Sequence, residues 1–397
     1  MNALTKKKVY FLLSAGWGPV VRALPIANQL KEKGIKTYFH VAGKVADVMI
    51  RAGHEQVSPD RFPQKGNPKR DWWTLDQLLA DFGWHDRDFV HNRFAAYRKA
   101  IEAVKPDALV VDFNTAAMLA ARSLRIPTAA IVQSCFHPAR QKPYIIWWQQ
   151  PPDNLPTITP LLNEILEHYG ASLVSSAEEL QIGDVTVIPS FPEFDPLLSV
   201  DDSTHYVGPI LGNDVGHDAG PEFSQADKLA VVYPGRPHDM GGESGALIMR
   251  NVVPALVQLG MDAIVSRGEF DYPEYNQPRQ GVVFSSWVSL PTLDSRCVLI
   301  VHHGGHGACL SGVQLGIPGL VIPTFAERAY NARNLESLGC AISLSPENLS
   351  PEAVAEKLSL LQTNSGYTQK AIGWRQELAN RNYGGADKVA ELVIGLL

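Results

Sequence analysis

Short apolar runs rich in β-branched residues recur along the chain, and stretches with the apolar spacing of a helix lie between them. In the first half, the runs predicted as strands are residues 9–13, 37–41, 108–112, 128–133 and 172–176. A second series covers residues 229–233, 262–266, 282–285, 298–302, 319–323 and 341–344. Continuous apolar runs of this length are typical of strands covered on both faces, as in parallel sheets. The pattern predicts an α/β protein with two Rossmann-like domains.

Pro, Gly and Asp gather in residues 190–225, where neither helical nor strand periodicity is sustained. Such a composition is typical of a segment that joins two domains. We therefore expect a first domain over residues 1–205 and a second over residues 206–380.

Charge and cysteine content narrow the functional classes. The 397 residues include 35 Lys and Arg against 41 Asp and Glu, which gives a net charge of −6. This balance argues against nucleic-acid binding, which needs a basic surface. The four cysteines are scattered, so we expect free thiols in a reducing cytoplasm. The apolar run at residues 9–13 is too short for a signal peptide or a membrane span.

The strongest chemical signal lies in the second half. A predicted buried strand ends in His302 and His303, Gly304–Gly307 form a turn, and a helix is predicted to begin near Ala308. Glycines let a ligand approach the backbone, and a helix N-terminus attracts anions. His303 adds a hydrogen-bonding group. The segment predicts a diphosphate site at the carboxyl end of a strand, the alternative being a tight turn with a structural histidine.

This segment resembles the nucleotide-sugar signature of family 1 glycosyltransferases, the UDP-glycosyltransferase superfamily, in its bacterial natural-product type. The matching residues are Trp287, Val301–Gly307, Gly316–Pro318, Pro323 and Asn331–Ala332, with weaker matches at 106–113 and 207–210. The resemblance implies the GT-B fold, in which two Rossmann-like domains with parallel sheets face a central cleft. It also implies that residues 1–205 bind the acceptor, that residues 206–380 bind the nucleotide sugar, and that a last helix at about 381–397 returns to the first domain.

The resemblance also implies roles for single residues. Trp287 would stack on the nucleobase, Val288 would bond the base edge through its backbone, and Asn331 would support the phosphates. The whole implied donor-binding set is Trp287, Val288, His303, Gly304, Gly305, His306, Gly307, Ala308, Glu327, Arg328 and Asn331. These groups offset the charge of the leaving diphosphate, so no metal is implied.

Four donor-site positions depart from the family pattern. Ser311 stands where the family often has a Glu that grips both ribose hydroxyls, so a dTDP-sugar, which lacks the 2′-hydroxyl, becomes more plausible. Glu327 and Arg328 replace the Asp-Gln pair that binds the sugar hydroxyls. Glu327 can still accept hydrogen bonds from the sugar, while Arg328 could pair with a carboxylate or phosphate, or be solvated. Ala308 replaces the common Thr.

The expected catalytic base is also absent. In the family, a His in the loop after the first strand removes the acceptor's proton, and here Pro19 stands at that position. Asp112, at the end of a strand, is the first candidate to replace it, because a carboxylate in a dry site can act as a base. His137 is the second candidate, and an acceptor that is already anionic would need no base. The alternative for Asp112 is a structural role, in which its carboxylate caps a helix N-terminus or stabilises a turn.

Aromatic residues cluster in the first half. We expect the acceptor to contact Gly18, Pro19, Trp72, Trp73, Phe136 and Trp147. Such side chains line apolar pockets, although they also pack long loops. A bulky apolar or aromatic small molecule is therefore the expected acceptor.

Together these features predict an inverting glycosyltransferase that moves a sugar from a dTDP- or UDP-sugar to a hydrophobic small molecule. The nucleotide sugar is a co-substrate, and no cofactor, metal or nucleic acid is expected. A homodimer is compatible with the sequence. Two alternatives stay open: a nucleotide-sugar hydrolase or epimerase, and a catalytically silent nucleotide-binding partner of another glycosyltransferase.

Overall fold

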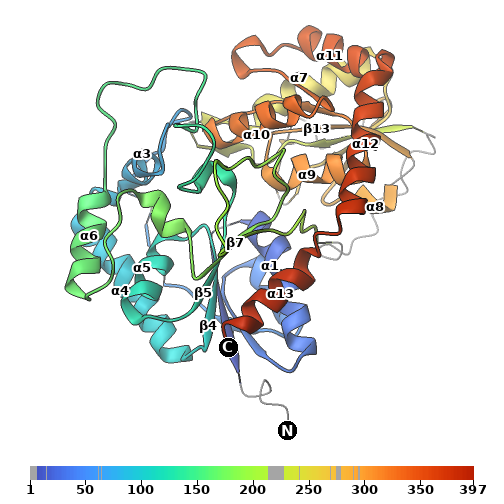
Figure 1. The fold of residues 1–397 in the computed structure, drawn as a ribbon. Helices are drawn as coiled ribbons and strands as arrows, with labels where there is room; N and C mark the ends of the chain where they lie inside the picture. Colours follow the sequence, from blue (N-terminus) through green and yellow to red (C-terminus); the bar gives the residue numbers. More distant parts are fainter. Residues whose placement is uncertain are drawn as a thin grey trace. The chain divides into compact units, whose positions relative to one another are not determined.

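The computed structural model describes residues 7–397 apart from residues 15, 61, 64, 213–227, 241, 269, 274–278, 289 and 294–295. The chain divides into two compact units (Figure 1). Unit 1 comprises Met1–Pro68, Trp72–Gly212 and Tyr383–Leu397, and unit 2 comprises Lys69–Asp71 and Asn213–Asn382.

Unit 1 is built on a seven-stranded parallel sheet in the order β3-β2-β1-β4-β5-β6-β7. The strands are β1 (Lys8–Leu13), β2 (Lys36–His40), β3 (Glu55–Val57), β4 (Ala108–Asp112), β5 (Thr128–Ile131), β6 (Val185–Ile188) and β7 (Thr204–Tyr206). The strand order reverses between β1 and β4. In open α/β sheets, ligands bind beside the carboxyl ends of strands at such a reversal.

Helices connect and cover this sheet. They are α1 (Trp17–Glu32), α2 (Lys44–Arg51), α3 (Leu75–Leu79), α4 (Arg87–Val104), α5 (Thr115–Leu124), α6 (Thr159–His168) and α13 (Gly385–Gly395). The last helix of the chain, α13, packs against α1 and buries Val389, Ala390 and Val393 (Figure 1). The C-terminal helix is therefore part of unit 1.

Unit 2 contains a six-stranded parallel sheet in the order β12-β11-β8-β13-β14-β15 and an antiparallel hairpin of β9 and β10. Its strands are β8 (Leu229–Tyr233), β9 (His238–Asp239), β10 (Gly242–Glu243), β11 (Ala263–Ser266), β12 (Val282–Ser285), β13 (Cys297–His302), β14 (Gly319–Val321) and β15 (Ala341–Ser343). Its helices are α7 (Gly245–Gln258), α8 (Leu290–Leu293), α9 (His306–Leu315), α10 (Ala326–Ser337), α11 (Pro351–Thr363) and α12 (Ser365–Arg381). Here the order reverses between β8 and β13.

The predicted α/β architecture with two parallel sheets is confirmed, with one wrong strand. Residues 172–176 form no strand, and Leu173 in this segment is 57% exposed. The sheet is instead continued by Val185–Ile188, whose β-branched side chains are largely buried. No helix in the described part of the chain is long and apolar enough to cross a membrane.

Candidate functional site

The turn between β13 and α9 has the backbone form of an anion site. Gly305 is the N-cap of α9, no side chain caps the helix, and its first turn contains no acidic residue. Gly304 has a φ of 88°, and a Cβ added there would lie 2.8 Å from the carbonyl oxygen of Arg328. Only glycine fits this position. The N–H groups that begin α9 carry the positive end of the helix dipole, and the N-cap glycine has no side chain to accept from them.

His303 follows β13 directly, and two glycines lie against its ring. A Cβ on Gly235 would come within 3.1 Å of Nδ1, and one on Gly305 within 2.7 Å of Nε2. Nδ1 lies 3.2 Å from the carbonyl oxygen of Tyr233, at the end of β8. Burial, reinforced by the charge of Arg328, lowers the pKa of His303 well below its usual value. The ring is therefore neutral and fixed between the ends of the two strands where the sheet order reverses.

Asn331 on α10 holds the turn after β13 by a hydrogen bond to Gly304. Its Nδ2 donates to the carbonyl oxygen of Gly304 over 3.1 Å and to Glu327 Oε1 over 2.9 Å. The preceding histidine, His302, accepts the Gly304 N–H at Nδ1 over 3.1 Å, and burial lowers its pKa to about 4. The Asn331 amide thus positions both the glycine turn and the carboxylate of Glu327.

Arg328 has buried partners that the sequence did not reveal. Its Nη2 bonds Asp239 Oδ2 at 2.6 Å, and its Nη1 donates to Ser244 Oγ at 2.9 Å and Thr324 Oγ1 at 2.6 Å. Its guanidinium also lies 4.0 Å from the centre of the Phe325 ring. The side chain is 7% exposed. Arg328 therefore ties α10 to the β9 hairpin and to the start of α7, a structural role distinct from the expected contact with the donor.

The segment predicted to bind the nucleobase follows β12. Trp287 is half-buried, and Ser285 Oγ donates to its carbonyl oxygen over 2.7 Å. The carbonyl oxygen of Val288 accepts the Tyr233 hydroxyl over 2.6 Å. Tyr233 thus connects both predicted parts of the donor site, because its backbone contacts His303 and its hydroxyl fixes Val288.

The remaining predicted donor residues lie in the first turns of α9. His306 is buried, Gly307 is exposed, and Ala308 is half-buried. A Cβ added at Gly307 would meet nothing within 4 Å. Ser311 donates its hydroxyl to the carbonyl oxygen of Gly307 over 2.8 Å. The structure therefore brings the glycine turn, His303 and Asn331 together at the start of α9.

In unit 1, Asp112 is held by an arginine that the sequence analysis did not assign to it. Arg22 donates from Nε to Oδ2 over 3.1 Å and from Nη2 to Oδ1 and Oδ2 over 3.0 and 2.9 Å. The side chains of Arg22 and Asp112 are 12% and 2% exposed. Gly18 and Pro19 lie in the first turn of the same helix, α1. Asp112 ends β4, so this pair lies at the strand reversal of unit 1.

Three of the predicted aromatic residues, Trp72, Trp73 and Phe136, are buried inside unit 1. Trp72 is fully buried and stacks on Phe136, with ring centres 5.8 Å apart. Trp73 is 8% exposed, whereas Trp147 is half-buried and meets Trp148 edge-on. Of these predicted acceptor contacts, Trp147 keeps the larger accessible surface.

His137 is buried close to the same aromatic residues. Its Nδ1 accepts the Ala139 N–H over 3.0 Å, and burial lowers its pKa to about 4. A histidine with so low a pKa is unprotonated at neutral pH and is only a weak base.

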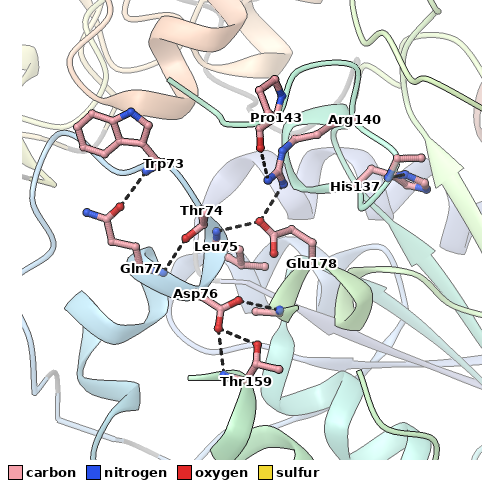
Figure 2. Close-up of polar contacts among 12 residues, drawn as sticks. Trp73, Thr74, Leu75, Asp76, Gln77, His137, Arg140, Pro143, Thr159 and Glu178 are labelled. Carbon is pink, nitrogen blue, oxygen red and sulfur yellow. Dashed lines mark hydrogen bonds and ion pairs between the residues drawn. The ribbon is translucent and has the colours of Figure 1, made fainter. Parts of the chain in front are cut away.

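Unit 1 also contains a cavity of about 270 Å³ that the sequence analysis missed (Figure 2). Arg140 and Glu178 face it as an ion pair of 2.8 Å, and Glu178 also accepts the Leu75 N–H. Asp76 lies beside this pair. Burial alone would raise the pKa of Asp76, but hydrogen bonds from Ala177 and Thr159 and their neighbours lower it overall. None of the residues predicted to bind the acceptor lines this cavity.

Within the described ranges, no group of three or more His, Cys, Asp or Glu side chains is arranged to hold a metal ion.

Residues 250–392 match the family model described as the erythromycin biosynthesis protein CIII-like, C-terminal domain. The 10-deoxymethynolide desosaminyltransferase of Streptomyces venezuelae is 24% identical over 60% of this chain and 55% of its own length. The L-demethylnoviosyl transferase of Streptomyces niveus is 33% identical over 25% of this chain and 26% of its own length. This chain thus spans about a quarter to a half of these curated relatives.

Solved structures match over nearly the whole chain. The glycosyltransferase of kitacinnamycin matches with a TM-score of 0.73 and 17% identity, and the alignment covers 98% of this chain and 99% of that one. The calicheamicin glycosyltransferase CalG4 matches with a TM-score of 0.72 and 20% identity over 98% of both chains. The predicted GT-B fold is confirmed. Residues 250–392 are similar to the CIII-like C-terminal domain, and the predicted resemblance to bacterial natural-product glycosyltransferases of family 1 is confirmed.

Proposed function

We propose that this protein is an inverting glycosyltransferase that moves a sugar from a nucleotide diphosphate to a small hydrophobic molecule. The observation that carries the proposal is the uncapped start of α9, with His303 beside it at the strand reversal of unit 2. Backbone N–H groups and a helix dipole at such a place suit a diphosphate. The named sugar-transferring relatives support the same chemistry.

The same groups would stabilise the leaving group. When the acceptor attacks the anomeric carbon from the face opposite the diphosphate, one displacement inverts the configuration and leaves negative charge on the nucleotide. Fixed N–H groups at the start of α9 offset this charge without rearranging. Asn331 keeps Gly304 in place, and the Glu327 carboxylate that it orients is the proposed acceptor of sugar hydroxyl hydrogen bonds.

The proposed donor is a dTDP-sugar or a UDP-sugar, with little discrimination between them. Ser311 directs its hydroxyl to the Gly307 carbonyl oxygen and supplies no carboxylate for two ribose hydroxyls. Among structures with the same fold, the spinosyn rhamnosyltransferase SpnG was solved with thymidine diphosphate and VinC with dTDP. These complexes support a thymidine nucleotide for this chain as well.

Asp112 is the proposed group that receives the acceptor's proton. Its carboxylate ends β4 at the strand reversal of unit 1, and Arg22 holds both of its oxygens. Hydrogen bonds from the arginine stabilise the carboxylate, which makes it a weaker base. An acceptor with an acidic hydroxyl, such as a phenol, suits a weak base of this kind.

A panel of UDP- and dTDP-sugars tests the function. Ligand stabilisation grows with the logarithm of the ligand concentration over Kd, so thermal unfolding identifies donors without an acceptor. Product analysis with the best donor alone, and then with apolar acceptors, separates the alternatives. Free sugar from donor alone would indicate a hydrolase, and binding without any turnover would indicate a silent partner. Transfer to an acceptor supports the proposal.

A further inference from the structure

We infer that His303 holds the donor diphosphate only after it takes up a proton, so that donor binding and protonation occur together. The inference rests on the proposed donor site. It concerns the protonation state of the His303 ring in the free protein and in the complex.

The hydrogen-bond geometry fixes which ring nitrogen carries the hydrogen in the free protein. Nδ1 of His303 lies 3.2 Å from the Tyr233 carbonyl oxygen, and a carbonyl only accepts. Nδ1 must therefore be the donor. A neutral imidazole carries one N–H, so Nε2 presents a lone pair. This nitrogen is the one beside Gly305, where an added Cβ would lie 2.7 Å away.

A diphosphate cannot bond to that lone pair. Its non-bridging oxygens are acceptors, as Nε2 is, and two acceptors facing each other repel. The imidazolium form removes the conflict, because both nitrogens then donate. Nδ1 keeps its bond to Tyr233 and Nε2 makes a charge-assisted bond to the phosphate without rotation of the ring. The glycines on both sides leave the ring no bulky neighbour at these positions.

The charges around the ring explain why the proton is absent before the ligand arrives. Burial, Arg328 on α10, His302 on β13 and Arg236 after β8 all disfavour the imidazolium, whereas the Tyr233 carbonyl favours it. The helix start at Gly305 adds positive potential.

The carboxylates on the neighbouring elements are already engaged. Asp239 bonds Arg328, and Glu327 accepts from Asn331. A bound diphosphate adds negative charge beside the ring, and this charge favours the imidazolium.

The coupling between donor binding and protonation predicts that donor affinity falls as the pH rises. Below the pKa of His303 in the free protein, the ring is already protonated and the affinity is independent of pH. Between that pKa and the higher pKa of the complex, binding takes up about one proton, and Kd rises about tenfold per pH unit. The proton comes from the buffer and returns to it when the nucleotide leaves.

Calorimetry of the full chain with UDP-glucose and dTDP-glucose, without acceptor, measures this directly. Titrations near neutral pH in PIPES and in Tris differ in the buffer's heat of ionisation, and neither buffer contains phosphate. The dependence of the binding enthalpy on that heat counts the protons taken up. Nucleotide sugars are the better probes, because a terminal phosphate titrates near pH 6 itself. For the wild type we expect an uptake approaching one proton.

Two variants complete the experiment. In His303→Gln the side-chain amide donates a hydrogen bond without taking up a proton. Proton uptake on binding should therefore fall to near zero, while binding itself stays measurable. His168→Gln, an exposed histidine on α6, should keep the wild-type uptake. Binding of either probe without proton uptake, or equal uptake by wild type and His303→Gln, would overturn the inference. If no nucleotide sugar binds at all, the proposed function itself fails, and the inference fails with it.

Discussion

Replacing Arg328 by leucine would remove a buried cation and leave its partners in place. Asp239, which is 15% exposed, would lose the 2.6 Å ion pair, and the hydroxyls of Ser244 and Thr324 would lose a shared donor. Removing one partner of a buried ion pair typically costs about 3–5 kcal/mol, because the other charge stays buried without compensation. We therefore expect the variant to destabilise unit 2 by that amount, in the absence of any ligand.

Thermal unfolding followed by circular dichroism measures the effect. For a domain of about 150–250 residues, 1 kcal/mol corresponds to about 2–4 °C in Tm, so the expected loss is about 6–20 °C. Arg333→Leu on the same helix is the matched control. Arg333 is exposed, and loss of an exposed charge costs about 1 kcal/mol or less.

The comparison also separates the structural role of Arg328 from donor binding. The inferred structural role is wrong if Arg328→Leu and Arg333→Leu unfold at the same temperature while only Arg328→Leu has lost affinity for nucleotide sugars. Arg328 would then be a direct ligand of the donor.

Three further predictions concern the site residues. His303→Ala should weaken the binding of UDP and dTDP by about 1.5–3 kcal/mol, measured by calorimetry, and unchanged affinity for both would contradict the assignment. Ser311→Glu should shift competition binding toward UDP, while the wild type should prefer UDP by less than tenfold, about 1.4 kcal/mol. Asp112→Asn should still bind nucleotide but lose at least about 100-fold in kcat on an acceptor with a neutral hydroxyl. His137→Ala should lose less, and near-full turnover by Asp112→Asn would show that the base lies elsewhere.

The parallel sheets and the turn after β13 were predictable because their signals are local. Buried parallel strands require continuous apolar runs, and the turn at Gly304–Gly307 requires glycines wherever the backbone is left-handed or closely approached. The wrong strand at residues 172–176 shows the limit of this signal. A short apolar run flanked by serines has no pattern that distinguishes it from an exposed loop, and only pairing with β5 identifies Val185–Ile188 as the strand.

The ion pairs at both strand reversals could not be predicted in this way. Arg22 and Asp112 are 90 positions apart, and Arg328 and Asp239 are 89 apart. Periodicity reports the face on which a side chain lies and says nothing about a partner so distant in sequence. The burial of Trp72 was missed for the same reason, because its stacking partner Phe136 comes from a different loop.

In the proposed function, the donor diphosphate lies across the first turn of α9. Gly307→Ala adds a methyl group that meets no protein atom within 4 Å, and a helical Cβ points toward the N-terminal end of its helix. Gly373→Ala adds the same methyl at an exposed position on α12, also with nothing within 4 Å. Both variants should fold at least as stably as the wild type, because alanine favours a helix over glycine by up to about 1 kcal/mol.

Calorimetric titration of these two variants with dTDP-glucose and UDP-glucose is the most direct test. We predict that Gly307→Ala weakens the binding of both by at least about tenfold, or ~1.4 kcal/mol, while Gly373→Ala binds them as the wild type does. If Gly307→Ala binds either nucleotide sugar with wild-type affinity, the diphosphate does not lie at this helix start.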